Sequence, residues 1–463
     1  MIRNDDWLLT LDEALHTRLM AHLFPGDRDE HGAVIRAGLV ETNRGTRLIA
    51  RELHLAEDGV DFVPGKRGYR MLTPEFVRDQ VLACRDDRLV YLTVHNHFGR
   101  DTVGFSRTDL DSHERSYPAL LDISGRPVGA LVLNENALAG DIWTPAGTRH
   151  EIRETVVVGR NIQRFYPETP PGQQKADQVC VRQPRWFCNR GQDLLSQMKV
   201  SVVGAGGIGA PLITMLGRLG IGHIVAIDPD RVEKVNLPRM PEARRLDARI
   251  GTPKVRVARR AVRKANRKIR FDGIQASVIE PEVARQLVDS DFIFLAADSH
   301  LARMIVNAVS YQYLIPAIQL GSKIETDEEQ GEVGEIRGHE RLLLPGSGCL
   351  RCNRLISPTK LQEEARSEGE RKQNRYIDEV PAPSVITFNS ALAAQAANDF
   401  LLMMGGLIED EAHLEYVWMR PRKRSTESQG PLPNQSACSD CGTQGSTRRA
   451  RGDLDELPLP QRK

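Results

Sequence analysis

Hydrophobic and polar residues follow two different patterns along the chain, one before and one after about residue 170. Up to about residue 165, short apolar runs such as AVIRAGLV, RLVYLTV, GALVLN and TVVVG are separated by turn residues. One longer amphipathic stretch, Thr73 to Cys84, predicts a helix. Short strand-like runs beside a helix are typical of an α+β or three-layer α/β domain. We therefore expect residues 1–165 to form such a domain.

The second pattern begins after residue 178. The stretch KVSVVGAGGIGAPLITMLGRLGIGHIVAIDPD predicts a strand, a glycine-rich turn, a helix and a second strand, and DFIFLAADS and YLIPAIQLG predict two more buried strands. This alternation is typical of a doubly wound, Rossmann-like α/β sheet, expected over residues 179–441. Residues 166–178 are rich in Pro, Gly and polar residues and predict a linker. Residues 442–463 contain few apolar residues, and we expect a disordered tail.

The composition narrows the class of protein. The 463 residues include 63 basic and 62 acidic ones, so nothing in the net charge favours nucleic acid or a membrane surface as a partner. No apolar run approaches the roughly 20 residues that a membrane span needs. Four of the seven cysteines form two C-x-x-C pairs, which suits bound metal in a reducing compartment better than disulfides. We expect a cytoplasmic protein.

Two histidines follow the apolar run LVYLTV. Alternate side chains of an extended segment point to the same face, so His95 and His97 can converge on one metal ion. Asp109 could add an oxygen ligand. Two imidazoles and a carboxylate leave a fourth position for water, as in catalytic zinc sites, where zinc lowers the pKa of that water to about 7. The alternative is that both histidines are solvated surface groups in a turn.

The longer pattern, His95-x-His97 followed by Ser106 and Asp109, resembles the signature of the JAMM metalloproteases, also called JAB or MPN-plus. Phe98 stands where that family usually has proline, which is not a ligand. The resemblance implies that residues 1–165 are a JAMM/JAB metallo-isopeptidase domain with one catalytic Zn²⁺.

The same resemblance implies further roles in the peptidase site. Glu30, at the start of the run AVI, would be the general base and acid, and Ser106 would hold the oxyanion or orient the site. Glu41 and Glu52 are nearby acids that could take the role of Glu30 instead.

A glycine-rich turn lies between the first strand and helix of the second pattern. Gly204, Gly206, Gly207 and Gly209 would allow a nucleotide phosphate to approach a helix N-terminus, and Asp228, at the end of the next strand, could bind a ribose hydroxyl. These residues alone fit a dehydrogenase that binds a dinucleotide as well as they fit an enzyme that binds ATP.

The residues that follow separate the two alternatives. The stretch DPDRVEKVNLPR (228–239), IGTPK (250–254) and ADSHLAR (297–303) resemble, in the same order, three motifs of the ubiquitin-activating enzyme superfamily, which includes ThiF, MoeB and HesA proteins. The resemblance implies adenylation of a carboxylate by ATP with Mg²⁺. The residues implied to contact the nucleotide, its phosphates or Mg²⁺ are Asp228, Asp230, Asn236, Arg239, Lys254 and Asp298. Adenylation needs cations that neutralise the triphosphate, whereas hydride transfer would need none of this set.

Members of this superfamily are dimeric, and an arginine from an N-terminal helix can reach the partner's ATP. Arg182 resembles that arginine, so a homodimer is expected. Two C-x-x-C pairs, Cys349 with Cys352 and Cys438 with Cys441, would give four thiolates and hence a closed, structural Zn²⁺ site. Reduced thiols without metal are the alternative.

Both implied activities concern the same kind of C-terminal tail. We therefore predict a bacterial-type bifunctional enzyme that adenylates a ubiquitin-like protein and cleaves after its tail. One alternative is activation of a sulfur-carrier protein for cofactor or cysteine synthesis. Another is a scaffold that binds a ubiquitin-like partner through an inactive peptidase half. The loop between the first C-x-x-C pair and residue 389 has no cysteine, so the activated tail is expected to pass to a partner such as a conjugating enzyme.

Overall fold

A computed structural model describes residues 6–63, 71–169, 184–327, 332–366, 383–409, 412–430, 435–444 and 446–460. The chain forms two compact units, which we call the N-terminal and the C-terminal unit. The N-terminal unit contains Met1–Pro171, Gln312–Leu314 and Arg448–Glu456, and the C-terminal unit contains the rest. The boundary after Pro171 falls inside the stretch predicted as a linker, residues 166–178.

The N-terminal unit is built on one eight-stranded sheet with the order β1-β3-β2-β6-β7-β8-β9-β10, and β1 also pairs with β9. Its strands are β1 (Trp7–Asp12), β2 (Gly32–Thr42), β3 (Gly45–Leu55), β6 (Val90–Asn96), β7 (Val128–Leu133), β8 (Leu138–Trp143), β9 (Arg149–Val158) and β10 (Gln163–Phe165). A separate short pair joins β4 (Phe62–Val63) to β5 (Met71–Leu72).

Helices cover both faces of this sheet. On one face, α1 (Glu13–Leu23) buries Leu15, Leu19 and Leu23 against strand residues. On the other face, α2 (Pro74–Asp87) and α3 (Arg107–Ser124) enclose a second apolar cluster. The unit is thus a three-layer α/β sandwich. The helix predicted from Thr73 to Cys84 corresponds to α2, for which the Thr73 side chain is the N-cap.

The expectation that residues 442–463 are a disordered tail is wrong for the segment that packs on the N-terminal unit. Ala450 is fully buried, Gly452 forms a β-bridge with Leu39, and the Arg449 guanidinium bonds the Asp12 carboxylate. Gly38 makes this approach possible, because a Cβ there would lie 2.4 Å from the carbonyl oxygen of Ala450. The prediction failed because it relied on the polar composition of residues 442–463, whereas backbone pairing and a buried ion pair order part of this segment.

The C-terminal unit contains the doubly wound sheet that the sequence predicted. Its order is β13-β12-β11-β14-β15-β16-β17-β18. The strands are β11 (Lys199–Val203), β12 (His223–Ile227), β13 (Arg270–Ile274), β14 (Phe292–Leu295), β15 (Ala317–Asp327), β16 (Glu332–Leu343), β17 (Tyr416–Arg420) and β18 (Ser425–Gln429). Strands β11 to β15 pair in parallel, and β16 to β18 add an antiparallel extension. Strands β12 and β13 are added on one side of β11, and β14 and β15 are added on its other side. The strand order therefore reverses between β11 and β14, and ligands of doubly wound folds bind at such a point.

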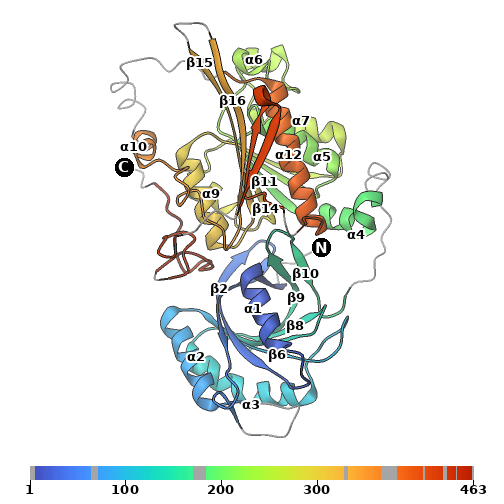
Figure 1. Cartoon of the computed structure of the whole chain (residues 1–463), viewed down its shortest axis with the longest axis vertical. Helices are drawn as coiled ribbons and strands as arrows, with labels where there is room; N and C mark the ends of the chain where they lie inside the picture. The colour runs from blue at the N-terminus through green and yellow to red at the C-terminus, as the bar shows by residue number, and fades with distance from the viewer. Residues whose placement is uncertain are drawn as a thin grey trace. The chain divides into compact units, whose positions relative to one another are not determined.

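Helices flank both faces of this sheet as well. Figure 1 shows α5 (Gly209–Leu219), α7 (Lys254–Ala265) and α12 (Ile386–Gly405) on one side of the strands and α9 (His300–Gln312) on the other. Among the described residues, the other helices of this unit are α4 (Pro184–Gln197), α6 (Arg245–Ile250), α8 (Pro281–Arg285) and α10 (Pro358–Ala365), and short 3₁₀ turns span Lys234–Asn236 and Pro421–Lys423.

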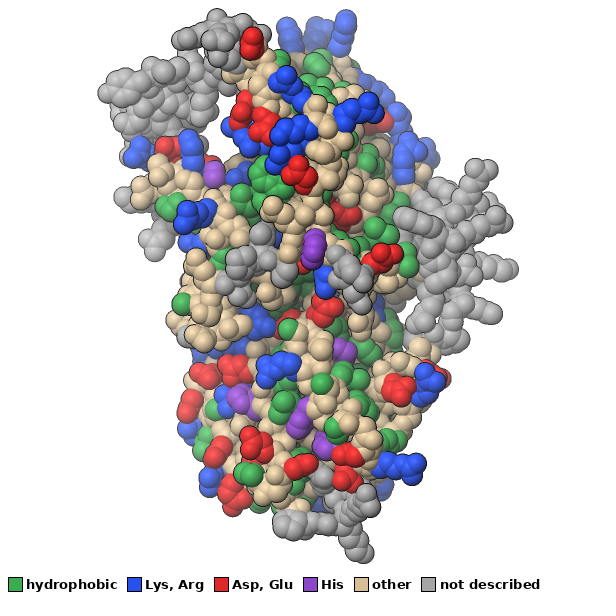
Figure 2. Space-filling view, in the orientation of Figure 1, with side chains coloured by type: hydrophobic (Ala, Val, Ile, Leu, Met, Phe, Trp, Pro, Cys, Tyr) green, Lys and Arg blue, Asp and Glu red, His purple; other side chains and the backbone are tan. Residues whose placement is uncertain are grey.

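Side chains of both charges occur on the face shown in Figure 2, with hydrophobic side chains between them, as the formal net charge of +1 predicts. Among the described helices, none combines the length and the hydropathy needed to cross a membrane.

A buried pair of acids makes a testable contribution to the stability of the C-terminal unit. Glu340 of β16 and Asp399 of α12 each carry an oxygen with no hydrogen-bond partner in the described part of the chain. Burial raises the pKa of Glu340 well above its ordinary value, and the neighbouring Asp399 raises it further. Burial also raises the pKa of Asp399.

An acid whose pKa is raised by folding loses stabilising free energy as the pH rises above its unfolded-state pKa. Glu340→Gln should therefore increase the free energy of unfolding more at pH 8 than at pH 5. The difference should be about 1 kcal/mol or more, since one pKa unit corresponds to about 1.4 kcal/mol. Thermal or urea unfolding at both pH values measures it, with the exposed Glu427→Gln as control. An equal effect at both pH values would contradict the prediction.

Candidate functional site

Three predicted metal ligands of the N-terminal unit lie together. His95 is in β6, where its backbone pairs with Gly32, and His97 continues the extended segment by donating its N–H to the Leu133 carbonyl at 2.8 Å. Asp109 lies in the first turn of α3. Ser106 is the N-cap of α3, and its hydroxyl accepts the N–H of Asp109 while the Asp109 carboxylate accepts the N–H of Ser106. Ser106 therefore orients Asp109, which is one of the two roles expected for it.

The geometry of this cluster fits a tetrahedral zinc ion. The Nε2 atoms of His95 and His97 lie 3.6 and 3.5 Å from Oδ2 of Asp109. Metal–ligand distances of about 2.0–2.1 Å in a tetrahedron separate the ligand atoms by about 3.4 Å. Nε2 of His95 is buried without a hydrogen-bond partner in the described chain. Nδ1 of His97 lies 3.1 Å from the Gly104 carbonyl, a bond that leaves Nε2 free for a metal.

A carboxylate stands beside the three ligands. Oε1 of Glu30 lies 3.9 Å from Nε2 of His97. Burial raises the pKa of Glu30, and the two histidines partly oppose that shift. A raised pKa suits a group that must both accept and deliver a proton. The two alternative acids lie elsewhere: Glu52 bonds Arg36 at 3.2 Å, and Glu41 donates its backbone N–H to Asp453.

The sequence did not predict the polar network next to this cluster. Asp141 of β8 is buried and accepts hydrogen bonds from Nδ1 of His113 at 2.7 Å and from Nε of Arg149 at 2.5 Å. His113 follows Asp109 by one helical turn and stacks on Tyr117 with ring centroids 4.6 Å apart. His113 was recognisable only by its spacing of four residues from Asp109, because Asp141 comes from a distant strand.

The glycine-rich turn lies at the point where the sheet of the C-terminal unit reverses. Gly204 has a φ of +96°, and a Cβ there would lie 2.8 Å from the Ala296 backbone, so this turn touches the loop after β14. A Cβ on Gly209 would lie 1.8 Å from the Gly204 carbonyl oxygen. Gly206 instead faces open space within 4 Å, where a phosphate could approach the N-terminal end of α5. A Cβ on Gly207 would lie 2.6 Å from Nδ2 of Asn389.

Two acids and a lysine lie beside this turn. Asp228 accepts the N–H of Ala205 at 2.7 Å and the N–H of Asp230 at 2.8 Å. Nζ of Lys254 lies 2.6 Å from the Asp230 carboxylate and 4.0 Å from that of Asp228. Burial raises the pKa of Asp228, and Lys254 opposes that shift. The structure thus brings together residues from the loop after β12 and from the start of α7.

The other predicted nucleotide contacts differ in how they are placed. Arg239 approaches the glycine turn, since its Cδ would lie 3.5 Å from a Cβ on Gly207. Asp298 is exposed in the loop after β14. The amide oxygen of Asn236 accepts the N–H of Glu233 at 2.9 Å, which makes it a local cap of the Asp230–Arg239 loop. Arg182 lies outside the described residues.

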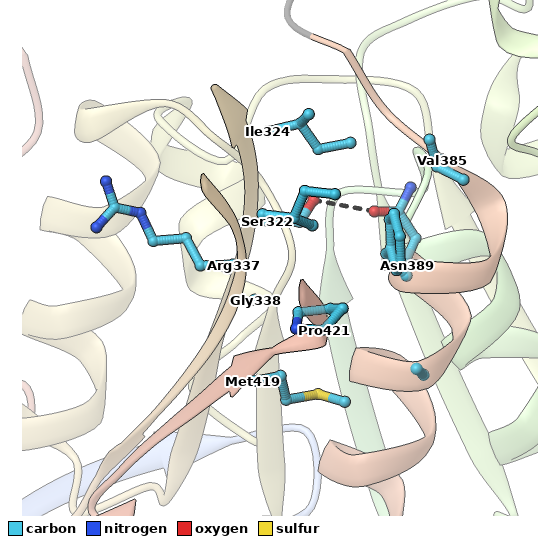
Figure 3. A pocket seen from close by; sticks show the side chains of 11 residues that line it. Ser322, Ile324, Arg337, Gly338, Val385, Asn389, Met419 and Pro421 are labelled. Atoms are coloured by element: carbon cyan, nitrogen blue, oxygen red, sulfur yellow. Dashed lines mark hydrogen bonds between the residues drawn. The ribbon is translucent and has the colours of Figure 1, made fainter. Parts of the chain in front are cut away.

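A small pocket beside the glycine turn was not predicted (Figure 3). Asn389 of α12 accepts a hydrogen bond from Ser322 of β15 at 2.9 Å across it, and the same amide donates to Ser384 at 2.9 Å. Its volume is about 20 Å³, room for about one water molecule. Asn389 is one of several polar residues of α12, which also contains Ser390, Gln395 and Asn398, so nothing in the sequence distinguished it.

The four paired cysteines of the C-terminal unit also converge. Sγ of Cys349 lies 3.7 Å from those of Cys352 and Cys438, and Sγ of Cys352 lies 3.5 Å from that of Cys441. Zinc–sulfur bonds of about 2.3 Å in a tetrahedron place sulfur atoms about 3.8 Å apart. Three of these cysteines are buried. The cluster therefore fits a zinc ion with four thiolate ligands.

Comparison with known families covers more than half of the chain. The ThiF family matches residues 181–445. The chain belongs to the ThiF family.

Several relatives of this ThiF family protein are named as activating enzymes or adenylyltransferases. It is 33% identical over 162 residues to the SAMP-activating enzyme E1 of Haloferax volcanii, which covers 35% of this chain and 55% of the relative. It is 30% identical over 134 residues to the molybdopterin-synthase adenylyltransferase of Escherichia coli, covering 29% of this chain and 53% of the relative. The chain thus spans about half the length of these relatives.

Solved structures resemble the ThiF family protein more distantly. The crystal structure of Escherichia coli MccB with ATP matches with a TM-score of 0.45 and 24% sequence identity, covering 59% of this chain and 76% of that chain.

The cysteine cluster gives a stability prediction for the ThiF family unit. Cys441→Ser should lower the zinc content of the full chain by about one ion per chain and lower the melting temperature of the C-terminal unit by roughly 5–10 °C, because a closed zinc site contributes several kcal/mol to folding. Metal analysis and calorimetry measure both effects. Cys84→Ala is the control, since Cys84 is buried in the N-terminal unit and should leave the zinc content unchanged. Full zinc content in Cys441→Ser would contradict the prediction.

Proposed function

We propose that this protein adenylates the C-terminal carboxylate of a ubiquitin-like protein with ATP and, in its N-terminal unit, cleaves the chain after such a tail as a JAMM-type zinc metallo-isopeptidase. The observation that carries the first activity is the contact of Lys254 with Asp230 and Asp228 beside the glycine turn. The observation that carries the second is the convergence of His95, His97 and Asp109 next to Glu30.

The adenylating step needs charge neutralisation at the triphosphate. The substrate carboxylate attacks the α-phosphorus of ATP, one P–O bond breaks, and pyrophosphate leaves. Lys254 and Arg239 would stabilise the negative charge that builds up on the phosphates. Asp228 would bind the ribose, and Asp298 would hold Mg²⁺, which would supply positive charge against the triphosphate.

The peptidase step depends on proton transfer by Glu30. Zinc, when bound by His95, His97 and Asp109, would supply Lewis-acid activation of a water molecule. Glu30 would take a proton and then deliver it to the leaving amine. Ser106 would keep Asp109 in place through the helix cap.

Relatives support the first activity with two kinds of partner. The SAMP-activating enzyme E1 and the NEDD8-activating enzyme E1 catalytic subunit of Arabidopsis thaliana are named for activating SAMP and NEDD8, and the latter enzyme is 30% identical to this chain over 177 residues. The sulfur carrier protein ThiS adenylyltransferase of Bacillus subtilis is 31% identical over 126 residues. Activation of a sulfur carrier is therefore the second candidate function.

The product separates these two functions. Mass spectrometry of the small protein after incubation with ATP, Mg²⁺ and a sulfur donor would show a thiocarboxylate if it is a sulfur carrier. Transfer to a cysteine of a conjugating enzyme would show a thiol-sensitive adduct instead. A homodimer is part of the proposal, and so is a cytoplasmic location.

An alternative to the bifunctional enzyme is a scaffold, in which the N-terminal unit binds a ubiquitin-like partner but has no peptidase activity. It predicts that the full-length protein binds about one zinc ion, at the cysteine cluster, rather than two. Metal analysis of the His95→Ala/His97→Ala variant beside the wild type decides between them, because only an occupied histidine site makes the zinc content fall in that variant.

A further inference from the structure

A histidine with no part in the proposed zinc site lines a cavity of about 410 Å³ in the N-terminal unit. This residue, His113 of α3, follows the proposed zinc ligand Asp109 by about one helical turn. Glu30, His95 and Asp109 form part of the same cavity wall. A molecule that reaches the zinc site through this cavity would therefore also meet His113.

Neighbouring groups hold the imidazole ring of His113 in one orientation. Its Nδ1 lies 2.7 Å from the carboxylate of Asp141. The ring stacks on Tyr117 with centroids 4.6 Å apart and an angle of 12° between the planes, and Phe105 meets it edge to face at 5.1 Å. A ring held at one nitrogen and packed against two aromatic side chains cannot turn, so the direction of Nε2 is fixed as well.

The hydrogen bond to Asp141 sets which ring nitrogen carries the proton. Asp141 also accepts Nε of Arg149 at 2.5 Å and Nε1 of Trp143 at 3.2 Å, so Arg149 compensates its charge without a second cation. A carboxylate only accepts hydrogen bonds, so Nδ1 of the neutral ring carries the proton and Nε2 is an acceptor. Among the described residues none bonds Nε2, and 8% of the His113 side chain stays exposed.

Other polar groups of the cavity wall are already hydrogen-bonded within the protein. The hydroxyls of Thr93 and Tyr117 lie 3.3 Å apart, and the Ser116 hydroxyl donates to the Ser112 carbonyl at 2.7 Å. Polar and apolar side chains line the cavity in similar numbers. An extended peptide presents an N–H and a C=O at each residue, and each needs a partner where water is excluded. Such a wall therefore suits an extended peptide backbone, for which His113 offers an unused acceptor.

We propose that Nε2 of His113 accepts a backbone N–H of the substrate tail and so holds the tail extended beside the zinc site. The inference rests on the proposed peptidase function and adds a substrate-binding residue to it. Asp141 is then a positioning residue, because it acts on the substrate only through the His113 ring. The hydrogen bond involves only the backbone of the tail, so it needs no side chain there and serves a tail that ends in glycine.

Hydroxamates that differ by a single N–H test the proposal. Acetyl-glycylglycine hydroxamate chelates zinc and places two backbone N–H groups upstream of the chelating carbonyl. In its two ketomethylene isosteres, CH₂ replaces one or the other N–H. At least one isostere should bind the zinc-loaded full chain about 3- to 10-fold more weakly than the parent, as expected for the loss of one hydrogen bond. Isothermal titration calorimetry measures the dissociation constants, and loss of binding in His95→Ala/His97→Ala shows that the ligands bind at this zinc.

Two substitutions separate the acceptor from the bond to Asp141. The asparagine amide lies near the position of Nδ1, so His113→Asn can keep the bond to Asp141 but has no group at Nε2. In this variant the parent should bind as weakly as the affected isostere. Glutamine extends its amide to the position of Nε2, so His113→Gln should retain the difference between the two ligands. His54→Asn makes the same substitution in β3, outside the cavity, and should change none of the affinities.

Each other outcome overturns a defined part of the account. Equal affinity of the parent and both isosteres for the wild type would overturn the hydrogen bond while leaving the peptidase site in place. An isostere effect that persists in His113→Asn would assign the N–H to another acceptor. A loss in His113→Asn that is equal for all three ligands would reduce His113 to a structural role. Failure of all three ligands to bind the zinc-loaded chain would overturn the proposed peptidase together with this inference.

Discussion

ATP–pyrophosphate exchange by the full-length protein, measured with its ubiquitin-like partner, should fall about 100-fold or more in Lys254→Ala. Nζ of Lys254 lies within 2.6 Å of Asp230 and 4.0 Å of Asp228, and the residue is only 8% exposed. Removing the ammonium group removes a cation from the proposed phosphate site. It also leaves two carboxylates close together where a triphosphate must bind, so repulsion adds to the lost attraction.

A matched control lies on the same helix. Lys264 of α7 has an exposed ion pair with Glu242 at 3.1 Å, and Lys264→Ala should retain wild-type exchange because surface ion pairs contribute little. Arg239→Ala should show a loss similar to that of Lys254→Ala, and Asp298→Ala should abolish exchange through the loss of Mg²⁺. Wild-type exchange in Lys254→Ala would contradict the proposed phosphate contact.

Cleavage of a ubiquitin-like fusion by the N-terminal unit should fall by a factor of about 10² to 10⁴ in Glu30→Gln, while the zinc content stays at the wild-type level. Glutamine keeps the size of Glu30 but cannot accept and deliver a proton. His95→Ala with His97→Ala should instead remove one zinc ion per chain together with cleavage, because two of three ligands are lost.

The two variants distinguish proton transfer from metal binding. His54→Ala is a suitable control, since His54 is a half-buried histidine of β3 that lies 3.4 Å from Glu52 and outside the metal cluster. Wild-type cleavage in Glu30→Gln would show that a different group transfers the proton.

Part of the fold was predictable because apolar runs alternate with turn residues in the sequence. Strands β11, β12 and β14 and the first half of β15 coincide with apolar runs of the sequence, whereas β13, with the sequence RFDGI, lies in no such run and was not predicted. The glycines at 204 and 209 are required by backbone contacts of 2.8 and 1.8 Å that no other residue would allow. The packing of residues 448–456 was not predictable, since Arg449 and Gly452 find their partners, Asp12 and Leu39, about 400 residues earlier in the chain.

In the two candidate sites, too, local features were predictable from the sequence and contacts between distant residues were not. The spacing of His95 and His97 along a strand was enough to predict that both imidazoles point to one side. The partners that come from remote elements were not visible in the sequence: Asp141 beside His113, and Asn389 beside Gly207, each arrive from a different part of the chain. The side chain of Asn236 also caps its own loop through the N–H of Glu233, a local contact that its motif position did not indicate.

The central claim is that the C-terminal unit adenylates the tail of a ubiquitin-like protein. The most direct measurement is the incorporation of radioactive pyrophosphate into ATP by the full-length protein, with Mg²⁺, in the presence and absence of a mature ubiquitin-like protein. We predict exchange only when that protein is present, and none in Asp298→Ala. Reduction of NAD⁺ by the protein, with no exchange for any ubiquitin-like or sulfur-carrier protein supplied, would contradict the account.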